Sequence, residues 1–362
     1  MASRASLYPN SKAGSTATTA HFTKQRQVAQ LAERLAKLSN RVVGLDKQVV
    51  TASEQAEKLK DLAGMHAALY VAQSKRLDDS ADWLMTARKK YLYNKTILLI
   101  TGGNAGLGLL VVRALMKGSH PYHIFMGSRS LEKASESIAT AKKDIRNSTS
   151  EVTPVQIDLV DDSSITKAFE QINSEVDHID VLVNNGGASL DNEVNLGKIG
   201  VRAMYNATWD CNVTGTHIVT QIFMSLLIRS ADPRLLFITS GTSSLEDAAK
   251  GVPSFAARPP AGWPKPLEPY PLTAYRTSKA ALNMLMLEWA RILKKDNVKI
   301  CCISPGRLAT SIGGFSKEQL LGLGFPEPEI GASFVKDVIE GKRDGDSEKV
   351  VRNTPGNLVQ PW

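Results

Sequence analysis

Residues 96–108, with the sequence TILLITGGNAGLG, are the clearest indication of fold in this 362-residue chain. The first half of this stretch is a short apolar run of the kind that forms a buried strand. Its second half places Gly102, Gly106 and Gly108 at the spacing GxxxGxG, directly before an amphipathic helical stretch. Glycines let the backbone of such a turn approach a pyrophosphate, and the free N–H groups of the following helix bind the anion. The stretch therefore predicts a dinucleotide-binding loop.

Outward from this loop, short apolar runs alternate with amphipathic helical stretches. We expect further strands at residues 123–126, 152–157, 181–184, 235–239 and 298–304. Buried apolar strands separated by helices indicate a parallel sheet covered on both faces. We therefore predict an α/β fold for residues 91–362, a Rossmann-type doubly wound parallel sheet that binds a dinucleotide.

The sequence before residue 91 has a different character. Residues 1–21 are small and polar, which predicts a disordered tail. Between Val28 and Val49 apolar residues recur at alternating spacings of three and four, a heptad seam, and a second helical stretch runs from about 53 to 87. The two helices would form either a hairpin packed on the next domain or a seam for partner chains. The apolar stripe is narrow, which favours a seam for partner chains, so we predict a helical coiled-coil interaction module at 22–90.

Charge and cysteine content indicate the partners and the cellular compartment to expect. The net charge is +8, and residues 1–94 alone hold 15 basic and 8 acidic side chains. This basic segment would contact an acidic protein surface or form a solvated helix face. Three cysteines without a CxxC or Cys/His cluster indicate a reducing compartment and no metal site. Without a long apolar run or a secretory signal, we expect an intracellular, cytoplasmic protein that neither spans a membrane nor binds nucleic acid directly.

The end of the second predicted strand bears on the choice of cofactor. It reads Gly127-Ser128-Arg129, where this fold meets the adenosine ribose, and NAD sites usually place an acid there. The sequence has no acidic residue from Gly127 up to Glu132. Arg129 would instead pair with a 2′-phosphate through charge-assisted hydrogen bonds, unless it is an ordinary surface arginine. The sequence thus predicts NADP(H), with NAD(H) as the alternative.

Residues 95–362 carry an ordered set of further motifs. They are TGGNAGLG at 101–108, Asp158-Leu159, NNGG at 184–187, Asn212, ITS at 238–240, YRTSK at 275–279 and SPGRLAT at 304–310. With these motifs in this order, the region resembles the short-chain dehydrogenase/reductase family. The resemblance implies hydride transfer between a nicotinamide cofactor and a small-molecule carbonyl or secondary alcohol. It also implies a homo-oligomer formed through this domain.

The catalytic residues implied are Asn212, Ser240, Tyr275 and Lys279. Tyr275 can exchange the proton on the substrate oxygen if its pKa falls from about 10 toward neutrality. Lys279 lies one helical turn later on the same face, where its ammonium would favour the phenolate. By resemblance, Lys279 also holds the nicotinamide ribose and Asn212 positions a water that relays protons to it. Ser240 would hydrogen-bond the substrate oxygen.

The same resemblance implies a cofactor site built from the phosphate loop, the strand ends and the turn after residue 304. Its residues are Gly102, Asn104, Gly106, Leu107, Gly108, Ser128, Arg129, Asp158, Leu159, Asn184, Asn185, Gly186, Tyr275, Lys279, Pro305, Gly306 and Thr310. The sequence departs from the family pattern in three places. NNGG replaces NNAG, Ala105 stands where many NADP users have a base, and a proline-rich segment at 251–272 widens the interval between Ser240 and Tyr275. So many prolines predict a stiff loop at the substrate entrance.

A second resemblance concerns residues from about 24 to 77. The stretch TASEQAEKLKDLAGMHAALYVAQSKRL at 51–77 is similar to the Hsk-three-like small subunit of the fungal DASH outer-kinetochore complex. It implies helical protein partners for residues 22–88, DASH subunits among them, and a place in the nucleus at the kinetochore or spindle. The chain would be a true fusion or two neighbouring genes read as one. The alternative principal function is a DASH subunit for microtubule attachment. A dinucleotide-binding regulator without turnover would not need Ser240, Tyr275 and Lys279.

Overall fold

The computed structural model describes Lys37 and residues 95–251, 260–265, 272–310, 312, 316–354, 356 and 358–362. The chain divides into two units, Met1–Leu84 and Met85–Trp362. The fold given below belongs to the second unit. Apart from Lys37, which is helical, the tail and coiled-coil predictions for residues 1–90 lie outside the described residues. No described helix is both long and apolar enough to cross a membrane.

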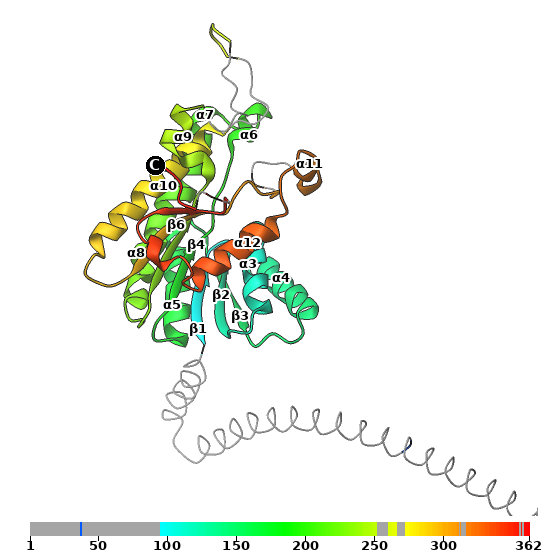
Figure 1. The fold of residues 1–362 in the computed structure, drawn as a ribbon, viewed down its shortest axis with the longest axis vertical. Coiled ribbons are helices and arrows are strands. Elements are labelled where there is room, and N and C mark those ends of the chain that lie inside the picture. The colour runs from blue at the N-terminus through cyan, green and yellow to red at the C-terminus, as the bar shows by residue number, and fades with distance from the viewer. Residues whose placement is uncertain are drawn as a thin grey trace, which may run out of the picture. The chain divides into compact units, whose positions relative to one another are not determined.

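A seven-stranded sheet forms the centre of the second unit, with the order β3-β2-β1-β4-β5-β6-β7 (Figure 1). All neighbouring strands pair in parallel. The strands are β1 (Thr96–Ile100), β2 (Tyr122–Ser128), β3 (Glu151–Gln156), β4 (Val181–Asn184), β5 (Arg234–Ile238), β6 (Lys299–Ser304) and β7 (Val350–Arg352). The six strands predicted from the sequence are confirmed, and β7 was not predicted. Because β1 lies between β2 and β4, the strand order reverses there, as the doubly wound fold requires.

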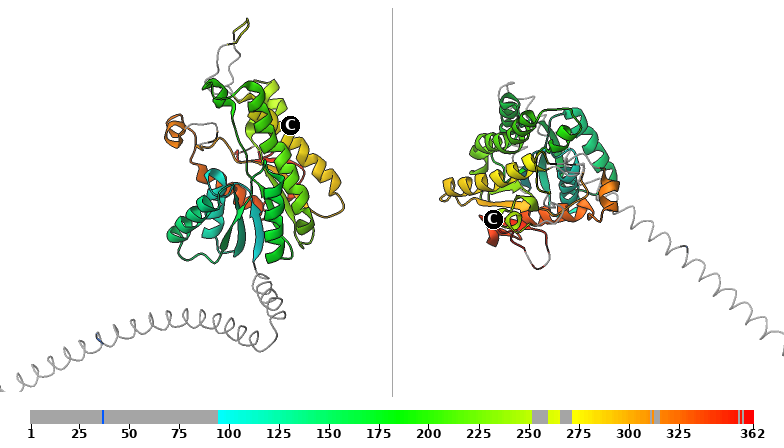
Figure 2. Two further views of the ribbon diagram at one scale, coloured as in Figure 1. Left: turned by 180° about the vertical axis from the view of Figure 1, so that it is seen from behind. Right: turned by 90° about the horizontal axis from the view of Figure 1, so that it is seen from above.

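Helices cover both faces of this sheet, which makes three layers (Figure 2). One face packs against α5 (Asp162–Glu175), α8 (Thr216–Leu227) and α10 (Thr273–Ile292). The other packs against α3 (Gly106–Lys117), α4 (Leu131–Asp144) and α12 (Pro328–Ile339). Successive residues of β1 alternate between the two cores, since side chains along a strand point to opposite faces. Burial on both sides explains why the strands are continuous apolar runs.

Shorter elements link these layers. They are α6 (Asp191–Asn195), α7 (Val201–Trp209), the π-helical turn η1 (Asp210–Gly215), the 3₁₀ turn η2 (Gly241–Ser243), α9 (Leu245–Ala249), α11 (Lys317–Gly322) and the 3₁₀ turn η3 (Asp344–Asp346). After β7 the chain turns back, and Val359 forms an antiparallel bridge to Val351. Of the proline-rich segment 251–272, only residues 251, 260–265 and 272 are described, so its predicted stiffness lies largely outside the described residues.

Candidate active site

The predicted phosphate loop connects β1 to α3. Gly102 has a φ of +63°, a left-handed conformation that glycine adopts without strain. Gly108 has a different role, since it lets the start of α3 approach the loop backbone closely. A Cβ on it would lie 2.3 Å from the carbonyl oxygen of Gly102. Ala105 precedes α3, and within the described residues no side chain caps this helix end. The first N–H groups of α3 can therefore bind an anion.

The segment after β4 is joined to this loop by hydrogen bonds. The backbone N–H groups of Asn185 and Gly186 donate to Thr101 Oγ1 at 3.0 and 2.8 Å. The Asn185 amide donates to the carbonyl oxygens of Thr101 and Gly102 at 2.9 and 3.1 Å. Gly186 also leaves room for Leu159, whose Cδ1 would lie 2.8 Å from a Cβ there. The departure from NNAG to NNGG thus accommodates Leu159.

Tyr275 and Lys279 lie on the first turns of α10, with Lys279 Nζ 5.7 Å from the Tyr275 ring centre. Burial raises the pKa of Tyr275 to about 12, although a hydrogen bond with Ser240 lowers it in part. Burial also lowers the pKa of Lys279 to about 8, and its Nζ donates to the carbonyl oxygen of Ile238 at 2.9 Å. The expected fall of the Tyr275 pKa toward neutrality is therefore not found, because desolvation of the phenolate dominates.

Asn212 occupies the π-helical turn η1 and is fully buried. Its side chain exchanges two hydrogen bonds with the backbone of Ala188, at 2.7 and 2.9 Å, and donates to Ser278 Oγ at 2.9 Å. A Cβ on Gly187 would lie 3.0 Å from Asn212 Oδ1 and 3.4 Å from Lys279 Nζ, so both groups border this glycine. The structure therefore brings Asn212 and Lys279 together, with the Asn212 side chain engaged by its neighbours.

Ser240 follows the carboxyl end of β5 and begins the turn η2. Its Oγ lies 2.9 Å from Thr242 Oγ1 and accepts from the Thr242 N–H. The Ser240 carbonyl oxygen accepts from Ser243 Oγ at 2.6 Å and from the Gln360 amide at 3.4 Å. Gln360 is buried and also donates to Ser243 Oγ at 3.1 Å. The segment that returns after β7 thus holds the backbone of the serine turn.

The residues predicted for the adenosine side fall into two groups. Arg129 is exposed after β2, and no described residue forms an ion pair with it. Asp158 follows β3, where its Oδ1 accepts from the Val160 N–H. Asn184, in contrast, is buried and donates to Thr220 Oγ1 at 3.0 Å, within the layer of α8. Arg129 and Asp158 are accessible to a ligand, whereas Asn184 supports the core.

The predicted nicotinamide side follows β6. Gly306 has a φ of +107°, and Thr310 donates its N–H to the carbonyl oxygen of Leu308 at 2.8 Å. Pro305 is buried and Thr310 is half-buried. Part of the chain directly after Thr310 lies outside the described residues. This turn therefore lies at the carboxyl ends of the strands, as Ser240 does, and borders the candidate site there.

Two residues near the site were not predicted from the sequence: Gln360, described above, and Asp191. Asp191, the first residue of α6, is 2% exposed, and its carboxylate accepts from the N–H groups of Ala274 and Tyr275 at 2.7 and 3.1 Å. Burial raises the pKa of Asp191, while the two backbone hydrogen bonds oppose that rise. No local periodicity signals this contact, because the partners are 83 and 84 residues apart.

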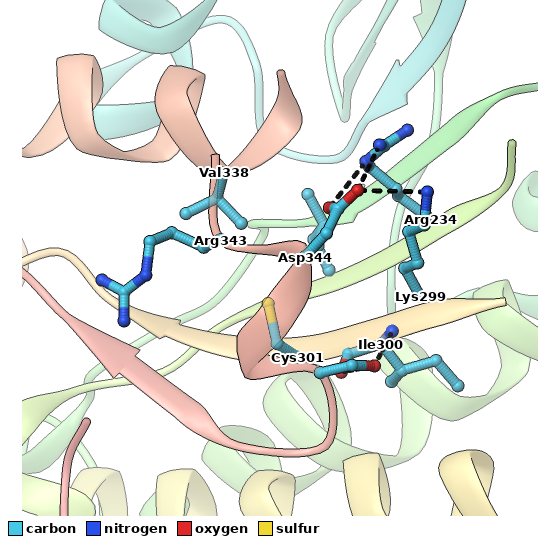
Figure 3. A pocket seen from close by; sticks show the side chains of 9 residues that line it. Arg234, Lys299, Ile300, Cys301, Val338, Arg343 and Asp344 are labelled. Carbon is cyan, nitrogen blue, oxygen red and sulfur yellow. Dashed lines mark hydrogen bonds and ion pairs between the residues drawn. The ribbon is translucent and has the colours of Figure 1, made fainter. Parts of the chain in front are cut away.

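The cavity drawn in Figure 3 lies at the opposite edge of the sheet. Arg234 and Lys299, which border it, are the first residues of β5 and β6. Asp344 pairs with both, at 2.7 Å from Arg234 and 3.1 Å from Lys299, and Asp232 also bonds both cations. The cavity itself measures about 10 Å³, enough for roughly one water molecule. This cluster ties η3 to the sheet and is separate from the residues around Tyr275.

Comparison with known proteins follows the same division of the chain. A sequence model of short chain dehydrogenases matches residues 96–257, and a model described as DASH complex subunit Hsk3 like matches residues 25–69. The short-chain dehydrogenase/reductase tropE of Talaromyces stipitatus is 40% identical over 275 residues, which cover 75% of this chain and 99% of that protein. The corresponding protein eupG of Phoma sp is 41% identical over 277 residues, which cover 74% and 98%.

Solved structures agree on the fold. The NADPH-bound carbonyl reductase from chicken fatty liver has a TM-score of 0.59 at 20% identity, over 74% of this chain and all of that one. The carbonyl reductase Sniffer of D. melanogaster has a TM-score of 0.57 at 21% identity, with the same coverage. Both sequence resemblances are thus confirmed as similarities. These two relatives, which this chain covers almost in full, favour an oxidoreductase over a kinetochore subunit as the principal function.

Proposed function

Because this chain belongs to the short-chain dehydrogenase/reductase family and is an NAD(P)-dependent oxidoreductase, we propose that it reduces carbonyl compounds and prefers NADP(H). The observation that carries this proposal is the environment of Tyr275. Its phenol interacts with Ser240 and lies beside Lys279, whose Nζ is 5.7 Å from the ring centre, and burial raises the pKa of the phenol so that it stays protonated at neutral pH. A protonated group beside the serine hydroxyl suits reduction, in which the substrate oxygen must gain a proton.

The residues fit such a cofactor at its diphosphate. The uncapped start of α3 offers N–H groups, and Gly108 keeps the loop too tight for any side chain. When bound, the cofactor would supply the hydride. Ser240 would donate a hydrogen bond to the substrate carbonyl oxygen, and Tyr275 would donate its proton to that oxygen as the charge develops.

Lys279 and Asn212 support Tyr275 in this proposal. Lys279 would carry its charge into the site below a pH of about 8 and would bind the nicotinamide ribose. The side chain of Asn212 bonds Ala188 and Ser278, so we assign it the task of holding the β4 segment beside Lys279. Ser278 in turn donates to the Tyr275 carbonyl oxygen at 2.8 Å, which connects Asn212 to Tyr275.

The test of the acid is Tyr275→Phe, with Tyr205→Phe on α7 as the matched control. Tyr275→Phe removes the proton and keeps the ring, so kcat with a panel of ketones and aldehydes should fall by about 10²-fold or more. NADPH binding, followed by fluorescence, should survive in both variants. If Tyr275→Phe retains more than about a tenth of the rate, the assignment of the acid is wrong.

Preference for NADP(H) is proposed from Arg129, which is exposed where the ribose phosphate would lie. Arg129→Ala should weaken NADPH binding by roughly ten- to a hundredfold, the value of one charge-assisted hydrogen bond, and leave NADH binding nearly unchanged. Arg146→Ala, in the loop after α4, removes the same charge elsewhere and should change neither. Equal losses of NADPH and NADH affinity in Arg129→Ala would refute phosphate recognition.

For residues 22–88 we propose a separate role as a helical interaction module, with DASH-type subunits as candidate partners. The heptad seam and the family match at 25–69 support it. The test is co-purification of the full chain with a set of DASH subunits, with a chain starting near Tyr91 as control. Equal recovery of the subunits with both chains would exclude the role.

A further inference from the structure

We propose that Asp191 is a positioning residue for the catalytic tyrosine: its buried carboxylate caps the helix that begins at Thr273 and so fixes where the phenol of Tyr275 lies. The inference rests on the proposed role of Tyr275 as the acid. Its basis is a contact between two segments that no sequence motif predicts. One carboxylate from the segment after β4 faces the first turn of the catalytic helix α10.

The start of α10 needs such a partner. The first N–H groups of a helix have no acceptor inside the helix, and a side chain at the N-cap position usually provides one. Leu272 occupies that position, and its side chain has no polar atom that could cap the helix. The next residues inward are Ala274, which is fully buried, and Tyr275, which is half-buried. The buried Ala274 N–H therefore needs an acceptor from elsewhere in the fold.

The carboxylate of Asp191 supplies both acceptors. Oδ1 accepts from the Ala274 N–H at 2.7 Å, and Oδ2 accepts from the Tyr275 N–H at 3.1 Å. Each oxygen therefore bonds one N–H, and the two N–H groups belong to consecutive residues in the first turn of the helix. The second of these bonds is made to the catalytic residue itself. A negative charge at this helix end is also favoured by the helix dipole.

The same short segment reaches the rest of the site. Ala188, three residues before Asp191, exchanges two hydrogen bonds with the side chain of Asn212. Asn185 and Gly186 bond the phosphate loop through Thr101. Residues 185–191 thus contact the phosphate loop at their first position and the first turn of α10, with Tyr275, at their last position, Asp191. Loss of its carboxylate should free the first turn of α10 while leaving the phosphate loop intact.

The predicted consequence is a selective loss of turnover. Misplacement of a reacting group by about 1 Å costs roughly 10²-fold in rate. Asp191→Ala should therefore lower kcat by about ten- to a hundredfold, with the KM for NADPH changed less than about threefold because the phosphate loop is not touched. Asp191→Asn keeps one acceptor oxygen in the same shape and should restore part of the lost kcat.

Asp161 provides a matched control. Its carboxylate also accepts from two backbone N–H groups, those of Ser163 and Ser164 at 2.9 and 3.3 Å, at the start of α5, which carries none of the catalytic residues. Asp161→Ala should lower the melting temperature without lowering kcat at saturating NADPH. If Asp191→Ala and Asp161→Ala have the same kcat, Asp191 has only a structural role and the proposal fails.

Two further measurements keep the outcomes separate. Should Asp191→Ala fail to fold, Asp191→Asn is tested alone, and a wild-type kcat in that variant together with a wild-type pH profile overturns the proposal. Asp191→Ala is also combined with Tyr275→Phe, where it should lower the residual rate no further, since the two changes act through one group. An active Tyr275→Phe single variant instead refutes the proposed acid, whereas an inactive one with a fully active Asp191→Ala refutes only the positioning role.

Discussion

Replacing Gly108 by alanine gives the sharpest test of the cofactor loop. The new Cβ would lie 2.3 Å from the Gly102 carbonyl oxygen and 2.6 Å from Asn185 Nδ2, whereas ordinary contacts begin near 3.4 Å. The Gly102 carbonyl must therefore retreat by about 1 Å, and overpacking of this kind costs about 1–3 kcal/mol. Alanine regains about 1 kcal/mol of helix propensity, because Gly108 lies inside α3. The net loss of folding stability should be about 2 kcal/mol or less.

The larger effect should fall on binding. The backbone displaced by Gly108→Ala belongs to the loop that would hold the diphosphate. Misalignment of a single charged hydrogen bond, worth about 1.5–3 kcal/mol, weakens NADPH binding by ten- to a hundredfold. Fluorescence titration with NADPH and a thermal melt measure the two effects separately. Gly200→Ala, at a glycine with open space around it and a φ of −78°, is the control. Wild-type affinity in Gly108→Ala would falsify the placement of the diphosphate.

Three other predictions concern the remaining parts of the molecule. The reductive kcat should fall as the pH rises through about 8, where Lys279 loses its charge, and a flat rate between pH 7 and 9 contradicts the role of that charge. Because its folded pKa lies below the unfolded one, Lys279 itself should contribute more folding stability as the pH rises above about 8, while the buried cysteines, whose pKa values are raised, act in the opposite direction. The difference in urea unfolding between the wild type and Lys279→Met across this pH range checks the sign. Gln360→Ala frees the backbone of the Ser240 turn and should raise the KM for the carbonyl substrate more than the Kd for NADPH, as steady-state kinetics and titration would show; equal changes would mean a general loss of packing. Asp344→Asn weakens a shared carboxylate between two cations and should lower stability by about 1–3 kcal/mol without changing kcat, and an unchanged urea midpoint would show that the cluster contributes nothing.

The sheet was predictable because each of its inner strands is a buried apolar run. β1 and β5 read as strands without any tertiary information, since both of their faces are covered. β7 was missed because it has only three residues and ends in Arg352. Its pairing depends on β6, which already presents a long buried edge. A strand this short gives too little periodicity for a sequence argument.

The candidate site also contains residues that could be predicted from the sequence and residues that could not. Tyr275 lies near both Ser240 and Lys279 in the structure, because a strand end and a helix start determine their places. The pKa of Tyr275 could not be predicted, since it depends on how much solvent the fold removes from the phenol. Asp191 and Gln360 were missed because each acts on backbone atoms of residues far away in the sequence. Such contacts carry no pattern along the chain.

The tight connection between the phosphate loop and the acid has a consequence for how this enzyme can diversify. Residues 185–191 bond Thr101, Asn212 and Tyr275 within seven positions, so an insertion there would shift at least one of them. The interval 251–272, which the sequence predicts to be a loop, lies between Ser240 and Tyr275 in the sequence, and closing a longer loop costs little additional entropy. New substrate preferences should therefore arise by lengthening and rewriting the second segment, while the first keeps a fixed length.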